Sequence, residues 1–145
     1  VERMAEELQL SIPARLSEVH ELAARVEEFG DTHRLPDPKV YVINLVLDEL
    51  ITNVVMHGFG GVREPEIRIT LRMAAGALVL IVEDNGQPFD PTRDSRPDVS
   101  SSLTSRPIGG LGLHLVKNFA DRLSYEFAGG WNRVTLEHDL APPPA

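Results

Sequence analysis

Apolar residues return every three or four positions in two stretches near the start of the chain, a spacing that puts them on one face of an α-helix. The first stretch covers residues 16–29, and we expect its helix to carry Pro13 in the first turn and to end at Gly30. The second helix is predicted to open at Asp37, as an N-cap before a proline, and to end near Gly58.

Strands are predicted where apolar and polar residues alternate, or where the chain is apolar at nearly every position. The predicted strands cover residues 8–12, 66–73, 78–82, 124–127 and 131–138. The run 78–82 is almost wholly apolar, which is typical of a central strand. A third helix is expected from about Leu111 to Leu123. This order predicts an α/β two-layer sandwich, with a mixed, mostly antiparallel sheet covered on one face by helices.

The 145 residues are enough for one domain with a sizeable core, which we expect to cover residues 1–140. A long loop rich in proline, serine, threonine, aspartate and arginine occupies residues 87–108. Loops of this length are usually lids or disordered. The proline-rich residues 141–145 are expected to be a disordered tail.

The charge and composition exclude several classes of function. A net charge of −8 argues against direct nucleic-acid binding, which needs a basic surface, and it permits a basic protein partner. The chain has no cysteine, so disulfides and cysteine-based zinc sites or nucleophiles are excluded. Because no apolar run approaches a membrane span and no signal-peptide pattern is present, we expect a cytoplasmic protein without membrane contact.

The second predicted helix carries three polar residues in one row beside its apolar face. With successive residues turned by about 100°, Glu49, Asn53 and His57 follow one another at intervals of four on the core side. The amide oxygen of Asn53 is a ligand type that Mg²⁺ prefers, and Glu49 lies one turn away, where it can accept a proton from a hydroxyl. We expect a structural role for His57 at the helix end. A solvated polar strip, or core side chains satisfied by local backbone, explains the row equally well.

A carboxylate follows the central strand. Asp84 needs a hydrogen-bond donor there, and the exocyclic amino group of adenine is one. Gly86 lets the backbone approach a flat ring, and Pro88 and Phe89 would form the floor of the pocket. The alternative is a plain Asp-Asn-Gly turn between the strand and the loop.

A glycine-rich segment, residues 109–113, leads into the third helix. Helix N-termini present free N–H groups to phosphate, and glycines let the phosphate come close. Arg106 is placed to reach a terminal phosphate, although a solvated loop charge explains it equally well. The segment matches neither the P-loop nor the dinucleotide-binding glycine pattern. Taken with the two preceding motifs, it makes ATP the leading ligand.

The three motifs together resemble those of one ATPase superfamily. The segments Asp48–Phe59, Val82–Pro91 and Gly109–Lys117 are similar to the sequence boxes of the GHKL ATPases, which include gyrase, histidine kinase and MutL types. Within that superfamily the chain most resembles the anti-sigma-factor serine-protein kinases of the RsbW/SpoIIAB type. The resemblance extends from the first predicted strand to about His138 and includes Tyr125–Leu136.

The resemblance implies a Bergerat ATP-binding fold with ATP and Mg²⁺ as cofactors. It implies that Glu49 is the catalytic base, Asn53 the magnesium ligand and Asp84 the adenine-binding carboxylate. It also implies that residues 87–108 form the ATP lid. The other residues expected to contact the nucleotide are Gly86, Pro88, Phe89, Arg106, Gly109, Gly110, Leu111, Gly112, Leu113 and Thr135.

The resemblance implies a serine/threonine-protein kinase. Such proteins phosphorylate a STAS-domain anti-anti-sigma protein, sequester a sigma factor and are commonly homodimers. The chain departs from sensor histidine kinases because Pro88-Phe89 replaces a later glycine of their second box. Two alternatives stay open: a non-catalytic, ATP-gated protein-binding module, and the ATPase domain of a larger sensor kinase.

Overall fold

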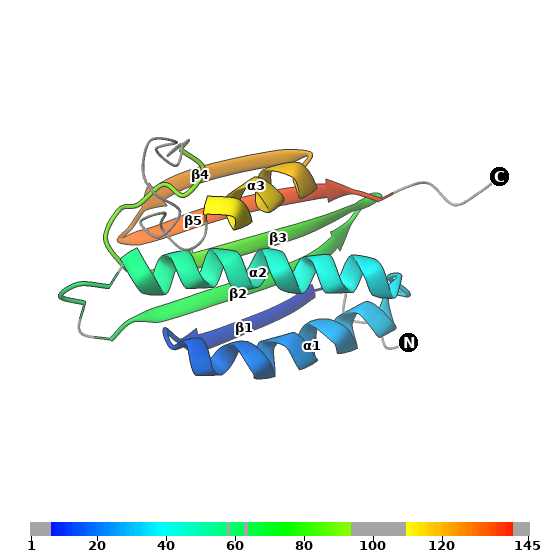
Figure 1. Ribbon diagram of the computed structural model, residues 1–145, viewed down its shortest axis with the longest axis horizontal. Coiled ribbons are helices and arrows are strands. Elements are labelled where there is room, and N and C mark those ends of the chain that lie inside the picture. Colours follow the sequence, from blue (N-terminus) through cyan, green and yellow to red (C-terminus); the bar gives the residue numbers. More distant parts are fainter. Residues whose placement is uncertain (1–6, 58, 63, 94–109, 141–145) are drawn as a thin grey trace.

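The computed structural model describes residues 7–57, 59–62, 64–93 and 110–140. The elements are β1 (Glu7–Pro13), a short 3₁₀ helix (Leu16–Glu18), α1 (Val19–Thr32), α2 (Asp37–His57), β2 (Glu66–Ala74), β3 (Ala77–Asp84), α3 (Gly110–Phe119), β4 (Arg122–Ala128) and β5 (Trp131–Asp139). Every predicted strand and helix is present in the predicted order, and Figure 1 shows their arrangement.

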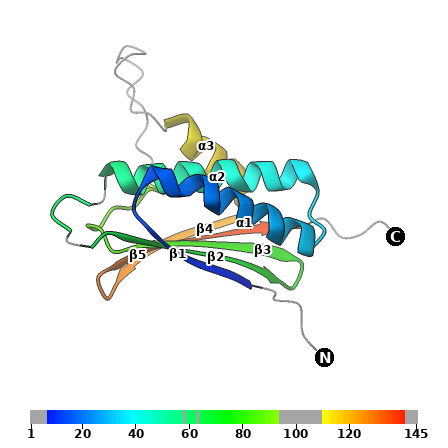
Figure 2. The same ribbon diagram turned by 90° about the horizontal axis from the view of Figure 1, so that it is seen from below.

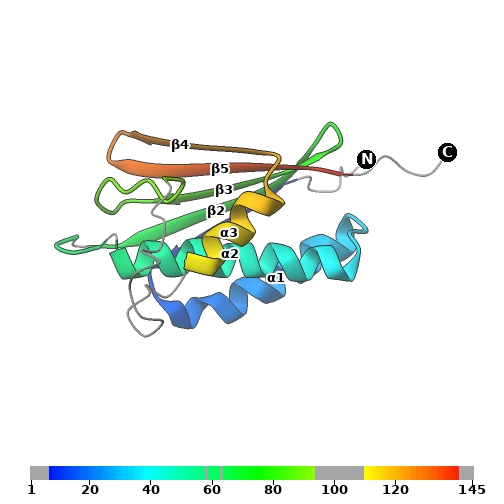
Figure 3. The same cartoon turned by 45° about the horizontal axis from the view of Figure 1, so that its top comes forward.

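The five strands form one sheet in the order β1-β2-β3-β5-β4, with antiparallel pairing throughout. Figure 2 shows α1, α2 and α3 on one face of this sheet, so the predicted two-layer sandwich is confirmed. A parallel pair, which a mixed sheet would contain, is absent among the described strands. Figures 1 and 3 place α2 between α1 and α3. The inner face of α2 therefore packs on the sheet, and α1 and α3 flank the helix on its two sides.

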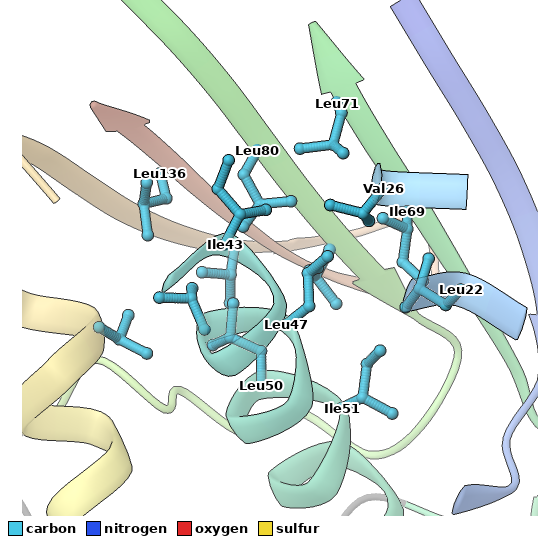
Figure 4. Packing of buried hydrophobic residues seen from close by; sticks show 14 of the residues in the cluster. Leu22, Val26, Ile43, Leu47, Leu50, Ile51, Ile69, Leu71, Leu80 and Leu136 are labelled. Carbon is cyan, nitrogen blue, oxygen red and sulfur yellow. The ribbon is translucent and has the colours of Figure 1, made fainter. Parts of the chain in front are cut away.

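The core lies between α2 and the middle strands. Because side chains alternate along a strand, Leu80 and its neighbours at every second position of β3 point toward the helices. Figure 4 shows these strand residues meeting Ile43 and Leu47 of α2, with Leu136 of β5 beside them. Val116 brings α3 into the same cluster, which holds both ends of the helical layer against the sheet.

The opposite face of the sheet is covered by none of the described helices and is mostly polar, and we call it the open face. Arg133 of β5 lies 3.1 Å from Glu83 and 2.9 Å from Glu126, one on each neighbouring strand. Arg68 of β2 lies over the ring of Trp131, with 3.9 Å from its guanidinium carbon to the ring centroid. Arg68 and Arg133 on this face therefore already have partners.

Two predictions about the first helix are wrong. Pro13 is the last residue of β1, paired with Glu66 of β2, so it lies in no helix. Gly30 lies inside α1, which continues to Thr32. A Cβ on Gly30 would lie 2.5 Å from a methyl of Val40 on α2. Close approach of the two helices, rather than helix termination, is the reason for this glycine.

Two other helix ends differ from the prediction. The amides of residues 39 and 40 donate to the carbonyl of Pro36, so Asp37 lies in the first turn of α2 and is not its N-cap. The α3 helix ends at Phe119 rather than at Leu123, because the amide of Asp121 already donates to Glu137 of β5 and directs the chain into the sheet. The predicted cap at residue 58, the tail 141–145 and residues 94–108 of the predicted lid lie outside the described residues.

Candidate functional site

A buried carboxylate ends the central strand. Asp84 is 6% exposed, and its Oδ1 accepts hydrogen bonds from the Asn132 side chain and the Gly86 amide, each at 2.9 Å. Its Oδ2 accepts none from the described residues. Burial raises the pKa of Asp84, and the two hydrogen bonds oppose that rise. A buried oxygen without a donor is costly, so Asp84 is suited to a ligand that brings an N–H group.

Asn132 of β5 connects the parts of this site, and it is not among the site residues predicted from the sequence. It is 2% exposed, and its Nδ2 donates to Asp84 and, at 2.8 Å, to the carbonyl of Gln87. Its Oδ1 accepts from the Phe89 amide at 3.0 Å and from the Tyr125 hydroxyl. All the hydrogen-bonding capacity of this amide is used, so it fixes both the carboxylate and the loop after β3.

A signal for Asn132 was present in the sequence. The strand alternates, and its inward positions read Asn132, Val134 and Leu136, with a polar residue in an apolar row. The same alternation overturns the expectation for Thr135. Thr135 pairs with Ile81 on the open face of the sheet, opposite the face that carries Asp84. Thr135 is therefore not part of the site.

The predicted polar row on α2 is present at Glu49 and Asn53. The Asn53 amide nitrogen lies 3.4 Å from Glu49 Oε1, and this leaves the Asn53 amide oxygen without a partner among the described residues. Burial raises the pKa of Glu49; the Asn53 hydrogen bond opposes this, and the charge of Asp48 adds to it. The pair thus offers a hard oxygen ligand beside a carboxylate whose proton affinity is increased. The side chain of His57 lies outside the described residues.

The structure brings these two groups together around one cavity. Asn53 of α2, Asp84 of β3 and Asn132 of β5 line it, with Phe89 on its wall. The other lining residues are Leu50, Val54, Val82, Pro91 and Val134. Its volume is about 10 Å³, which is room for one water molecule. This volume is smaller than a purine ring.

The other residues predicted to contact the nucleotide lie at different places relative to the cavity. Gly86 donates its amide to Asp84, while Pro88 is exposed and does not line the cavity. The residues 110–113 form the first turn of α3, whose backbone N–H groups have no partner within the helix. Arg106 and Gly109 lie outside the described residues.

The oxygen ligands of the site are few. Among the described residues, no group of three or more histidine or acidic side chains is placed to hold a metal ion. One amide oxygen at Asn53 suits an ion that takes its other ligands from phosphate and water, as Mg²⁺ does. Within the same part of the chain, no helix is long and apolar enough to cross a membrane.

Comparison with known proteins gives consistent results. The histidine kinase-like ATPase domain family matches residues 12–137. The serine/threonine-protein kinase BtrW of Bordetella bronchiseptica is 36% identical over 102 residues, which cover 70% of this chain and 72% of BtrW. The serine-protein kinase RsbW of Listeria monocytogenes is 33% identical over 100 residues, 66% of this chain and 64% of RsbW. The match therefore spans less than two thirds of that relative.

Two further matches have lower sequence identity. The anti-sigma F factor of Clostridium novyi is 28% identical over 91 residues, covering 58% of this chain and 59% of that factor. The crystal structure of the RsbU and RsbW domains of Rv1364c from Mycobacterium tuberculosis superimposes with a TM-score of 0.66 at 19% identity. That superposition covers 94% of this chain and 33% of the other, and at this identity it shows the fold alone.

Proposed function

Since the chain belongs to the histidine kinase-like ATPase domain family, we propose that it is an ATP-dependent protein-serine/threonine kinase and anti-sigma factor. The observation that carries the proposal is the convergence of Asn53 and Asp84, from two separate motifs, on one cavity. The names of the relatives BtrW, RsbW and anti-sigma F factor support the reaction and the regulatory role.

In this proposal Asp84 selects the base of the nucleotide. Its Oδ2 accepts the exocyclic amino group of adenine, while Asn132 and the Gly86 amide hold Oδ1 in place. A carboxylate held by two donors is already oriented, so little ordering is needed when the base binds. The first turn of α3, with Gly110 and Gly112, offers its N–H groups to the phosphates.

Phosphoryl transfer depends on the two polar residues of α2. Bound Mg²⁺ would neutralise phosphate charge during transfer. Asn53 would hold this ion through its amide oxygen. Glu49, one turn away, would accept the proton of the attacking serine or threonine hydroxyl, and its raised pKa suits that role. A module that only binds a partner has no need for such a base, which favours the kinase over the non-catalytic alternative.

The partners and the boundaries belong to the proposal. We infer a single ATPase domain over residues 1–140 with an ATP lid at about 87–108, acting in the cytoplasm. Its phosphoacceptor is a serine or threonine of a STAS-domain anti-anti-sigma protein, its second partner is a sigma factor, and the chain forms a homodimer. The net charge of −8 is consistent with protein partners rather than nucleic acid.

Calorimetry and a transfer assay test the proposal together. The intact chain is titrated with ATP, with and without Mg²⁺, beside Asn53→Ala and Glu49→Gln. We expect Asn53→Ala to lose the Mg²⁺-dependent part of the affinity. Glu49→Gln should bind ATP normally and transfer ³²P to a STAS-domain protein about 10²- to 10⁴-fold more slowly. Thr135→Ala, on the opposite face of the sheet, is the matched control.

Three results would contradict parts of this proposal. Normal transfer by Glu49→Gln would remove Glu49 as the base. ATP binding by the intact chain without transfer to any protein would favour the ATP-gated module. Absence of ATP binding would overturn the site itself.

A further inference from the structure

The outer face of α2 carries exposed apolar side chains. Tyr41 is 65% exposed, Leu45 37% and Met56 61%. At about 100° per residue these three lie within roughly 60° of one another around the helix. They therefore lie on the side of α2 that points away from the sheet, with Asp48 and Thr52 between Leu45 and Met56 on that side. The helix itself lies between α1 and α3 (Figures 1 and 3). We call the three apolar residues the α2 stripe.

An acidic groove borders the α2 stripe on the side of α1. The groove has a volume of about 330 Å³ and is lined by Glu27 and Asp31 of α1 and by Asp37, Val40, Tyr41 and Asn44 of α2. Its three carboxylates form no ion pair with any described residue. This differs from the open face of the sheet, where Arg133 is paired with two glutamates. Unpaired acidic charge beside exposed apolar surface suits a partner with basic and apolar side chains.

The proposed catalytic base lies on the other side of the α2 stripe. On the helix, Glu49 is turned about 80° from Tyr41 toward α3 and lies eight residues further along, or about 12 Å. A standard interface buries about 800 Å² on each partner, so one docked protein covers the groove, the stripe and the approach to Glu49.

We propose that the α2 stripe and the acidic groove dock the phosphoacceptor protein through a segment with basic and apolar side chains. The inference rests on the proposed kinase function, because it assigns the surface that presents a protein hydroxyl to Glu49. Tyr41 fills the role of anchor, since exposed tyrosines contribute large contact area at interfaces. The carboxylates of the groove orient the partner by charge complementarity.

The test uses the full chain and two labelled 16-residue peptides. One peptide carries arginine and leucine around a single serine, and the other has glutamate in place of each arginine. Binding is followed by fluorescence anisotropy at 0.1 M and 0.5 M NaCl. The variants are Tyr41→Ala/Leu45→Ala, Asp31→Asn/Asp37→Asn, and a charge-matched control, Glu7→Gln/Glu21→Gln, whose residues are exposed and outside the groove.

We expect the arginine peptide to bind and the glutamate peptide not to bind. The apolar double variant should weaken binding about tenfold at both salt concentrations. The acidic double variant should weaken it about fivefold at 0.1 M NaCl and less at 0.5 M, where charges are screened. Both should keep the ATP affinity of the intact chain. With the phosphoacceptor protein itself, both should raise KM and leave kcat unchanged.

Other results overturn the inference. Binding unchanged in both variants, or weakened as much by the control as by the groove variant, would remove the surface as a docking site. A change in sedimentation velocity showing that the variants disrupt self-association would assign the stripe to contacts between copies of this chain. If the intact chain neither binds ATP nor transfers phosphate, the proposed function fails. The peptide measurements need neither ATP nor transfer, so they test the docking surface separately.

Discussion

Replacing Asp84 by asparagine separates ligand binding from stability at the candidate site. The substitution keeps Oδ1, which accepts from the Asn132 side chain and the Gly86 amide. It replaces Oδ2, which has no described donor, by an NH₂ group. An adenine amino group would then face another donor, and both would stay unpaired. We therefore expect Asp84→Asn to lose ATP affinity and to stay folded.

The magnitudes follow from the surroundings of Asp84. A hydrogen bond to a charged acceptor contributes about 1.5–3 kcal/mol, so its loss should weaken ATP binding by roughly 10- to 150-fold in Kd. The free energy of unfolding should increase in the same variant. Burial raises the pKa of Asp84 above its usual 3.8, so the folded state binds the proton more tightly than the unfolded chain. The ionised carboxylate thus lowers the free energy of unfolding as pH rises from 3.8 through the raised pKa, and a neutral amide removes that cost.

Two measurements at pH 7.5 check this prediction. ATP affinity is measured by calorimetry with Mg²⁺, and the free energy of unfolding by urea titration followed by circular dichroism. Glu83→Gln is the matched control, because Glu83 precedes Asp84 in β3 and lies on the open face beside Arg133. It should leave ATP affinity unchanged. The reasoning fails if folded Asp84→Asn binds ATP within about threefold of the intact chain, or if it loses stability while Glu83→Gln does not.

Three further predictions follow. Because burial raises the pKa of Glu49, the acid limb of the pH–rate profile for phosphotransfer should lie above the usual carboxyl value of 4.5. Asp48→Asn removes a neighbouring negative charge and should move that limb to lower pH; an unmoved limb would assign it to another group. Asn132→Ala should lower the free energy of unfolding by about 2–4 kcal/mol in urea titration, since it strips partners from a buried carboxylate and a loop; a loss below about 1 kcal/mol would show that water replaces them. Gly30→Ala should lower the free energy of unfolding by about 1–3 kcal/mol in the same titration, because its Cβ would lie 2.5 Å from a valine methyl of α2. Gly60→Ala, whose Cβ would have nothing within 4 Å, should be nearly neutral, and equal effects of the two substitutions would refute the packing argument.

Patterns among residues close in sequence were enough to predict most of the helices and strands. The β2–β3 hairpin is an example: Ala75 and Gly76 adopt φ of 37° and 80°, as a two-residue turn between alternating strands requires. Such features depend on residues that are close in sequence, and the predicted strands 66–73 and 78–82 agree with β2 and β3 to within two residues. It failed at Pro13 and Gly30 because a strand partner and a helix neighbour, both distant in sequence, decided their roles.

The sequence by itself determined that Glu49 and Asn53 lie one turn apart and that Asp84 ends a buried strand, because the helical and strand periods are set by local backbone geometry. Only the tertiary structure decided that Asn53 and Asp84 share one cavity, that Asn132 holds the carboxylate, and that the neighbouring strand position 135 faces away. The reason is register: the pairing of β3 with β5 places Asp84 opposite Asn132, 48 positions further along the chain, and a shift by one residue would exchange the two faces of the strand.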